Sequence, residues 1–234
     1  MRKVKLTVFG LMFCLLLHLT GCAAAQKSLR VTLVLKTVTE VAEFWGTLLS
    51  GVEKAAEEYG VELKVLTSPR EIDIDKQIEL IRQVTADKPD VMILSAADYD
   101  RCAEATEEAI AAGIGVVAID TDVNAAGRAC FVGSNSYEIG LEMGRAMASY
   151  LPEGGKVAVI QHMLTTTTGI ERTRGVLDAL NEAGNIEILG SFCCDNSTEQ
   201  AQTITTELLS ADPEIRGFVC TNEVCNVGAA NALV

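Results

Sequence analysis

The sequence predicts an α/β protein built from two similar Rossmann-like lobes, each a parallel sheet flanked by helices, with a ligand cleft between them. Short apolar runs rich in β-branched residues alternate with segments of helical periodicity along most of the chain, and this alternation is typical of βαβ units. After the stretch 113–140 the strand–loop–helix order begins again. We therefore expect the chain to cross there from an N-terminal lobe, residues 29–132, to a C-terminal lobe, residues 133–234.

Local signals place the individual elements. Strands are expected at 29–35, 61–66, 91–94, 116–119, 130–133, 156–160, 186–190 and 217–220. Helices are expected at 43–59, 75–86, from an Asp98 or Asp100 cap to 112, at 136–150, 169–182 and 197–209, and from 223 onward. Asn135 and Glu138 have the spacing of a capping box that opens the helix at 136. The unbroken apolar run 116–119 is typical of a parallel strand covered on both faces.

The first residues have the pattern of an export signal. Arg2, Lys3 and Lys5 precede an apolar run that is short for a membrane span. The following Leu19-Thr20-Gly21-Cys22 resembles a bacterial lipobox, and in such signals the chain is cut before the cysteine that receives the lipid. We therefore expect a signal peptide at 1–21, lipidation of Cys22 and a linker at 22–28. A plain signal peptide or an uncleaved anchor helix is the alternative.

Composition and motifs exclude several classes of function. The chain is 49% apolar, which is enough for a globular core, and carries a formal net charge of −13, which repels nucleic acid phosphates. The cysteines beyond Cys14 and Cys22 have irregular spacings, so we expect buried small apolar residues rather than metal ligands; they are Cys102, Cys130, Cys193, Cys194, Cys220 and Cys225. Nucleotide-binding, serine-hydrolase and zinc-protease motifs are missing. We expect no cofactor, no metal and no enzymatic activity.

Candidate binding residues follow the strands, because open α/β sheets bind ligands at the carboxyl ends of their strands. Phe44 and Trp45 are adjacent rings that could stack on a sugar. Because consecutive side chains on a helix point in different directions, we expect one ring to contact the ligand and the other to pack into the core. Ser95 follows the third strand and Asp120 the fourth. A carboxylate accepts strong hydrogen bonds from vicinal hydroxyls. Asp122 is either a second acceptor or a turn residue.

The second lobe offers an arginine and an amide. Residues two apart on a helix diverge by about 200°, so only one of Arg172 and Arg174 can point into the cleft. Arg174 shares a stripe with Ile170 and Leu177; we expect it to face Asp120 and Arg172 to be solvated. Asn222 follows the last strand and can both donate and accept. The threonines at 165–168 either line the cleft mouth or form a polar loop.

Six segments together carry a family resemblance. They are Phe44-Trp45, DKQIELIRQVTADKPDVMILSAADYD, AIDTD, VGSNSYEIG, ERTRG and TNE. In this order and spacing the chain, from residue 29 to its end, resembles periplasmic sugar-binding proteins of the ribose-binding type, which share their fold with the effector domains of lactose-repressor-like regulators. The resemblance implies stacking by Phe44 or Trp45. It also implies hydrogen bonds from Ser95, Asp120, Asn135, Arg174 and Asn222.

The chain departs from that family in ways that affect the expected ligand. Family members often have Asn-Pro where this chain has Ser95-Ala96, Arg where it has Thr121 and Asp where it has Asn135, which argues against simple ribose. The family also continues for two further strand–helix segments. The resemblance therefore implies a second lobe that is incomplete, and a chain less stable and weaker in binding than a longer form.

These observations predict a lipid-anchored, extracytoplasmic receptor that delivers a sugar-like ligand to an ABC permease, and that is a monomer when full length. The alternative is a sensory module that signals to a membrane kinase or chemoreceptor without transport. A transcriptional regulator would need a helix-turn-helix where the leader stands. An enzyme would need a cleft carboxylate with a strongly raised pKa.

Overall fold

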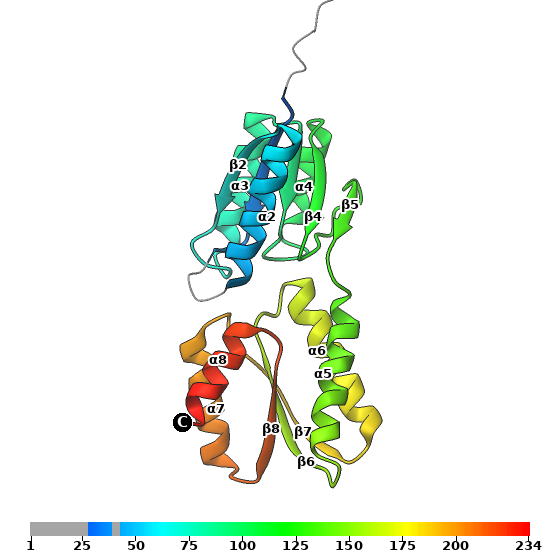
Figure 1. Cartoon of the computed structure of the whole chain (residues 1–234), viewed down its shortest axis with the longest axis vertical. Helices are drawn as coiled ribbons and strands as arrows, with labels where there is room; N and C mark the ends of the chain where they lie inside the picture. The colour runs from blue at the N-terminus through cyan, green and yellow to red at the C-terminus, as the bar shows by residue number, and fades with distance from the viewer. Residues whose placement is uncertain (1–27, 39–42) are drawn as a thin grey trace, which may run out of the picture.

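The computed structural model describes residues 28–38 and 43–234, and shows two α/β lobes stacked along the long axis of the molecule (Figure 1). The first lobe holds a five-stranded parallel sheet in the order β2-β1-β3-β4-β5. Its strands are β1 Arg30–Leu35, β2 Glu62–Thr67, β3 Val91–Leu94, β4 Gly115–Ile119 and β5 Cys130–Val132. Its helices are α2 Glu43–Tyr59, α3 Ile74–Asp87 and α4 Ala103–Ala111.

The second lobe repeats the pattern on a smaller sheet, with three parallel strands in the order β7-β6-β8. These strands are β6 Gly155–Gln161, β7 Ile186–Cys193 and β8 Ile215–Cys220. The helices are α5 Ser136–Tyr150, α6 Thr167–Ala183, α7 Thr198–Ala211 and α8 Glu223–Ala232. The predicted α/β class with parallel sheets flanked by helices is confirmed.

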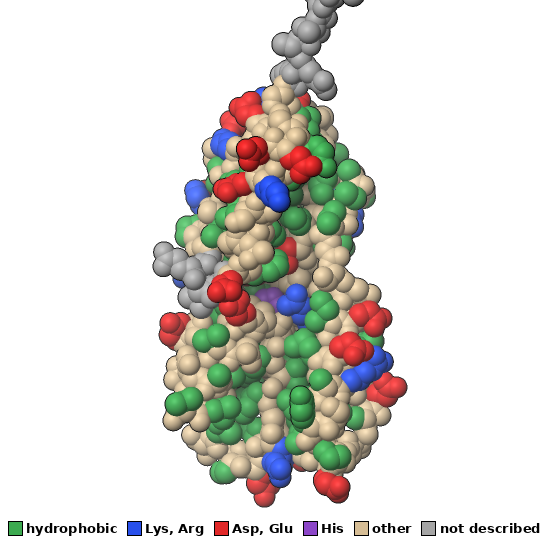
Figure 2. Space-filling view, in the orientation of Figure 1, with side chains coloured by type: hydrophobic (Ala, Val, Ile, Leu, Met, Phe, Trp, Pro, Cys, Tyr) green, Lys and Arg blue, Asp and Glu red, His purple; other side chains and the backbone are tan. Residues whose placement is uncertain are grey.

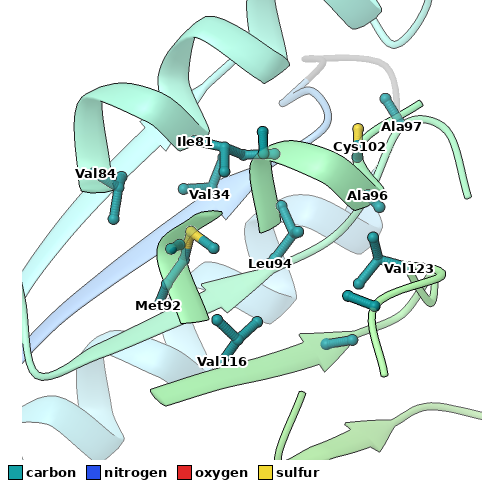
Figure 3. Close-up of a cluster of buried hydrophobic side chains, with 14 of the residues drawn as sticks. Val34, Ile81, Val84, Met92, Leu94, Ala96, Ala97, Cys102, Val116 and Val123 are labelled. Carbon is teal, nitrogen blue, oxygen red and sulfur yellow. The ribbon is translucent and has the colours of Figure 1, made fainter. Parts of the chain in front are cut away.

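Both sheets are covered on both faces, which is why the central strands β1 and β6 are mostly apolar. In β1, Val34 packs into the cluster beneath α3 and α4 (Figure 3). Leu33 and Leu35 pack on the other face, against Trp45 of α2. In the second lobe, Val157 and Val159 of β6 belong to a cluster with residues of α5 and α6. The opposite face is covered by α7 and α8.

Helices α5 and α6 approach each other closely through glycines. A Cβ added at Gly140 would collide with the backbone carbonyl of Arg172, and one at Gly175 with the carbonyl of Tyr137. A Cβ at Gly144 would lie 2.7 Å from the carbonyl oxygen of Val176. This backbone contact determines how α6 is rotated, and therefore which of its side chains reach the cleft.

Several boundaries differ from prediction, and three of the differences have a clear local reason. Strand β7 continues to Cys193 because Gly190, at φ 134°, takes up a bulge opposite Val157 and Ala158. Helix α4 starts at Ala103 without a side-chain cap, since Asp98 instead accepts hydrogen bonds from the backbone N–H groups of residues 100 and 101.

The threonine segment is a helix start rather than a loop. Thr166 caps α6 by accepting from the backbone N–H of Gly169 at 3.2 Å, so the helix begins two residues earlier than predicted. At α5 the expected cap is present, with Asn135 accepting from the N–H of Glu138 at 3.2 Å.

The predicted leader, its lipidation site Cys22 and the linker up to residue 27 lie outside the described residues. Among the helices that the structure does describe, none combines the length and the apolar character that a membrane crossing requires.

Candidate ligand-binding site

A cavity of about 250 Å³ lies between the two lobes, at the carboxyl ends of strands from both sheets. In the space-filling view a hollow is visible between the lobes, with basic and imidazole side chains beside it (Figure 2). The first lobe contributes Lys36, Phe44, Trp45, Glu71 and Asp120. The second contributes His162, Thr168, Arg172, Asn196, Asn222, Glu223 and Val224.

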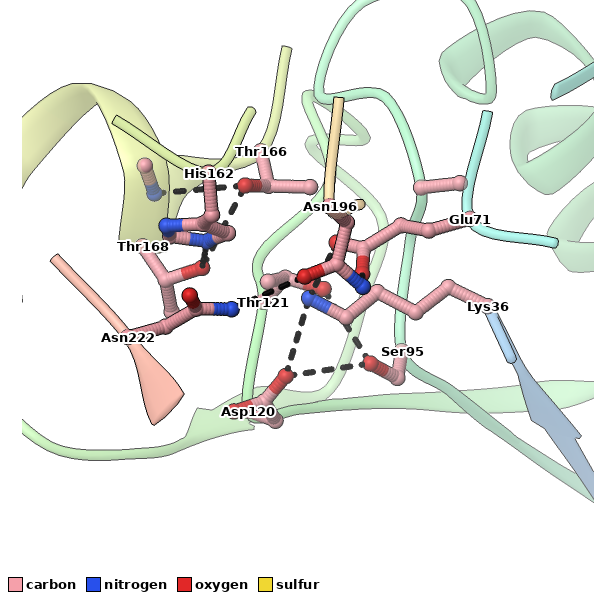
Figure 4. Close-up of polar contacts among 12 residues, drawn as sticks. Lys36, Glu71, Ser95, Asp120, Thr121, His162, Thr166, Thr168, Asn196 and Asn222 are labelled. Atoms are coloured by element: carbon pink, nitrogen blue, oxygen red, sulfur yellow. Dashed lines mark hydrogen bonds and ion pairs between the residues drawn. The ribbon is translucent and has the colours of Figure 1, made fainter. Parts of the chain in front are cut away.

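The first-lobe wall is a buried ionic cluster centred on Lys36, which follows β1. Its Nζ lies 2.8 Å from Glu71 Oε1 and 3.4 Å from Asp120 Oδ2 (Figure 4). The Lys36 and Glu71 side chains are only 5% and 3% exposed. Burial by itself lowers the pKa of Lys36, but the two carboxylates outweigh it and the pKa is raised. The lysine therefore stays charged, and both carboxylates are already paired.

Asp120 has a strained backbone conformation, and its carboxylate accepts a hydrogen bond from a buried serine. Its φ of 63° is left-handed, a conformation uncommon outside glycine, and such strain clusters at functional sites. Ser95 Oγ donates to Asp120 Oδ2 at 3.4 Å and lies 3.2 Å from Thr121 Oγ1. Ser95 is fully buried and is not among the cavity-lining residues. It can act on a ligand only through Asp120.

The second-lobe wall includes a histidine that the sequence analysis did not select. His162 follows β6 and is buried, with Nδ1 2.8 Å from Thr221 Oγ1 and Nε2 3.3 Å from Thr168 Oγ1. Burial lowers its pKa well below 6.5, and the charges of Lys36 and Arg172 lower it further. The imidazole is therefore neutral at pH 7, and the two threonine hydroxyls fix its orientation.

Two asparagines connect the lobes. Asn222 caps α8 by accepting from Cys225 N at 2.9 Å, and its Nδ2 donates to Asn196 Oδ1 at 2.9 Å. Asn196 Nδ2 in turn donates to Glu71 Oε2 of the first lobe, also at 2.9 Å. Elsewhere in the interface, Thr165 Oγ1 donates to Ala97 O at 2.9 Å. The lobes are thus in direct hydrogen-bonded contact around the cavity.

The arginine that faces the cavity is Arg172, so the expected orientation of Arg174 is wrong. Arg172 Nη1 donates to Thr221 O at 2.9 Å. Its Nε is buried and has no hydrogen-bond partner within residues 28–38 and 43–234. Burial lowers the pKa of Arg172, and the charge of Asp120 offsets this only in part. The guanidinium thus has one buried, unpaired donor and is attracted electrostatically to Asp120 of the other lobe.

Arg174 instead lies on the outer surface of the second lobe. Its side chain is 57% exposed, pairs with Glu171, and stacks with its Cζ 4.5 Å from the centre of the Tyr137 ring. The close packing of α5 on α6 rotates α6 so that the stripe beginning at Ile170, itself 40% exposed, does not face the cleft.

Of the two adjacent aromatic rings, Trp45 is packed into the lobe and Phe44 is open to the cavity and solvent. Trp45 is 5% exposed, packs on Leu33 and Leu35, and has Lys36 Nζ 5.7 Å from its ring centre. Phe44 is 49% exposed and meets Trp45 edge to face at 5.0 Å between ring centres. Both line the cavity, with Phe44 presenting the larger free surface.

The remaining candidates separate into those near the cavity and those away from it. Asn222 lines it, whereas Asn135 is an exposed helix cap outside the lining set. Asp122 lies in the irregular segment after β4, outside the lining set, and pairs with Arg128 at 2.7 Å. Among the described residues, no group of three or more His, Cys, Asp or Glu side chains is arranged to hold a metal ion.

The lining residues missed by sequence analysis obey the rule that found the others. Lys36 and His162 directly follow β1 and β6, and Glu71 and Asn196 lie in the turns after β2 and β7. Applying the strand-end rule to every strand would have identified them.

Comparison with known proteins identifies the family. Residues 31–234 match the family model described as a periplasmic binding protein domain. The chain belongs to this periplasmic binding protein family. It is similar to the D-allose-binding periplasmic protein of Escherichia coli (strain K12), with 25% identity over 241 residues that cover 100% of this chain and 76% of that protein. The ribose import binding protein RbsB of the same organism is 25% identical over 92% of this chain and 72% of its own length.

Solved structures of the periplasmic binding protein family share this architecture. A sugar transporter structure from Clostridium phytofermentans has a TM-score of 0.82 and 28% identity, covering 87% of this chain and 74% of that one. An ABC transporter periplasmic solute-binding protein from Actinobacillus succinogenes 130z, with bound D-allose, has a TM-score of 0.79 and 26% identity, covering 88% and 73%. This chain thus spans about three quarters of the length of these relatives.

Proposed function

We propose that this protein is an extracytoplasmic solute receptor that binds an uncharged monosaccharide-like ligand between its lobes and delivers it to an ABC permease. The observation that carries the proposal is a cavity lined by the guanidinium-bearing Arg172, whose Nε has no hydrogen-bond partner among the described residues, and by Asp120 from the other lobe. A donor and an acceptor on opposite walls suit a ligand that has several hydroxyl groups.

The size of the cavity favours a single sugar ring. A volume of about 250 Å³ lies just below the range of roughly 300–1,000 Å³ typical of small-molecule sites. Phe44 adds an open apolar ring on which the CH-rich face of a sugar can stack. Relatives named for D-allose and ribose support the same ligand class.

The charges of the cavity favour an uncharged ligand. Lys36 is already neutralised by Glu71 and Asp120, and Glu223 adds a third carboxylate to the lining. A phosphorylated or carboxylated sugar would be repelled by these groups, with Arg172 alone to attract it. Since both buried carboxylates are paired with Lys36, neither is placed as a free acid or base. Binding without turnover is therefore the proposed activity.

Calorimetric titration against D-allose, D-ribose, D-arabinose and D-fucose tests the proposal, with ribose 5-phosphate as the charged control. We expect at least one neutral sugar to bind and the phosphate to bind much more weakly or not at all. Failure of every neutral sugar, or preference for the phosphorylated one, would contradict it.

Membrane anchoring through Cys22 is part of the proposed function and rests on the Leu19-Thr20-Gly21-Cys22 pattern. Fractionation of cells that express wild type and Cys22→Ser tests it. The variant should move to the soluble extracytoplasmic fraction, whereas retention of both forms at the membrane would exclude lipidation at this residue.

A further inference from the structure

Two buried thiols of the second lobe face each other. Cys194 follows β7 and Cys225 lies in the first turn of α8, and both are fully buried. Their Sγ atoms are 3.4 Å apart. A disulfide bond is about 2.05 Å long, so the two sulfurs need to approach by roughly 1.4 Å. They share a small apolar cluster with Ile160 and Ala201.

The same two segments carry two of the cavity-lining amides. Asn196 is two residues after Cys194, and Asn222 is three residues before Cys225. The amide pair and the thiol pair are therefore two parallel connections between the loop after β7 and the start of α8, one at the cavity and one in the core behind it.

The loop after β7 is strained, so a covalent bond beside the amide contact would help to hold its conformation. Asp195 and Asn196 are consecutive left-handed residues, at φ 48° and 54°, and neither is glycine. The loop is held by Asn196 N donating to His162 O at 2.8 Å and by Ser197 N donating to Cys194 O at 2.9 Å.

We propose that Cys194 and Cys225 form a disulfide in the extracytoplasmic protein, and that this bond holds Asn196 and Asn222 in their cavity-lining positions. The expected effect on ligand affinity rests on the proposed function. The bond itself does not, because the geometry of the two thiols carries it.

The environment of the pair distinguishes an attacking thiol from a resolving one. The S–H of Cys225, together with the backbone N–H groups of Ser197 and Asn196, lowers the pKa of Cys194 although burial opposes this. The interaction with Cys194, followed by burial, raises the pKa of Cys225. Once the two segments have come together, Cys194 is therefore the more readily ionised thiol, and it is the one that attacks first.

The oxidant is a second disulfide, either oxidised glutathione or the active-site disulfide of an oxidoreductase. The Cys194 thiolate attacks one sulfur of the oxidant, whose disulfide bond breaks and releases one thiol. Cys225 then loses its proton and attacks the Cys194 sulfur, which releases the second thiol. The protein gives up two protons and two electrons, and the oxidant becomes two thiols. Because both sulfurs are buried in the folded protein, the exchange takes place while the segments are still folding.

The neighbouring cysteines are poorer partners. Cys193 Sγ lies 3.3 Å from Asp195 Oδ1, and burial raises its pKa to about 11. Burial likewise raises the pKa of Cys220 to about 12. Both therefore remain thiols at neutral pH, and the Sγ contacts of Cys193 are to the oxygens of His162 and Asp195 rather than to another sulfur.

Peptide mapping of protein refolded in glutathione buffer, without reductant, tests the bond directly. Trypsin leaves Cys193 and Cys194 in one peptide and Cys220 and Cys225 in another, since residues 175–215 and 217–234 contain no Lys or Arg. We expect these two peptides to be linked. The Cys193→Ala/Cys220→Ala variant should keep the link, and the Cys194→Ala/Cys225→Ala variant should lose it.

Thermal denaturation gives an independent reading. Closing the loop between residues 194 and 225 should raise the melting temperature of the oxidised form by on the order of 10 °C over the reduced form. Cys194→Ala/Cys225→Ala should melt at the same temperature with and without reductant. Cys130→Ala, which removes an exposed thiol, should behave as wild type.

Ligand titration then separates the two proposals. Reduction should weaken sugar binding severalfold in wild type and leave it unchanged in Cys194→Ala/Cys225→Ala. Two free thiols at these positions after refolding, or a link that disappears in Cys193→Ala/Cys220→Ala, would overturn the disulfide. A linked protein with equal affinity in both redox states would overturn its effect on the cavity. A linked protein that binds no sugar would refute the proposed function and leave the bond standing.

Discussion

The two walls of the cavity come from similar lobes but differ in their chemistry. The first-lobe wall is a buried ionic cluster, Lys36, Glu71 and Asp120, whose charges are satisfied within the lobe. The second-lobe wall is made of a neutral imidazole, amides and hydroxyls, together with the Glu223 carboxylate and Arg172, whose Nε is buried without a hydrogen-bond partner among the described residues. We therefore expect removal of Lys36 to act mainly on folding and removal of Arg172 to act mainly on binding. Asp120 should affect both, because it pairs with Lys36 and also lines the cavity.

The largest effect should come from breaking the first-lobe cluster. Lys36→Met leaves the buried Glu71 and the partly exposed Asp120 without their cation, and breaking a buried pair typically costs about 3–5 kcal/mol. Urea denaturation at pH 7 should show this loss. The matched control is Lys64→Met, which removes an exposed pair with Asp87 and should cost less than about 1 kcal/mol. Similar losses in the two variants would show that the cluster does not stabilise the lobe.

The arginine pair sharpens the comparison on the binding side. Arg172→Ala should lower the affinity for a sugar that binds the wild type by roughly tenfold to over a hundredfold. This equals about 1.5–3 kcal/mol, the typical contribution of a charged hydrogen-bond donor. Arg174→Ala, on the outer surface, should leave affinity unchanged. Trp45 is the single tryptophan and lines the cavity, so its fluorescence can follow the titration. The reverse ranking would restore Arg174 as the cleft residue.

Matched glycines test whether helix packing positions the second wall. Gly140→Ala inserts a methyl group against the backbone of Arg172 and should destabilise the protein by about 1–3 kcal/mol. It should also weaken ligand binding, because Arg172 is displaced.

Gly51→Ala is the control in α2 of the first lobe, where an added Cβ meets nothing within 4 Å. It should be neutral or stabilise by up to about 1 kcal/mol, because alanine favours a helix over glycine. Unchanged stability and affinity in Gly140→Ala would show that α5 does not set the orientation of α6.

The smallest expected effect is a pH dependence from His162. Its folded-state pKa lies well below 6.5 because of burial and the charges of Lys36 and Arg172. The unfolded state therefore binds more protons as the pH falls below about 6.5, and stability present above that pH is lost at up to about 1.4 kcal/mol per unit.

Urea denaturation at pH 7.5, 6.5 and 5.5 should show a steeper loss in wild type than in His162→Gln. Parallel pH profiles for the two proteins would mean that His162 is not held neutral by the fold.

The sequence by itself determined the α/β order, because apolar strands and amphipathic helices are local periodicities that tertiary context did not overturn. It also determined that Phe44, Trp45, Asp120 and Asn222 reach the cavity, since each lies in the segment that follows a strand. Parallel strands place these segments at one edge of a sheet whatever the remaining contacts are.

Only the tertiary structure decided which charges pair and which arginine faces inward. Lys36 meets Glu71, and Glu71 meets Asn196, across separations in the chain that no local pattern records. The choice of Arg172 over Arg174 depends on how α6 is rotated against α5, which backbone contacts at Gly140 and Gly175 determine. A helical stripe identifies the residues that share a face, but the packing of the neighbouring helix determines where that face points.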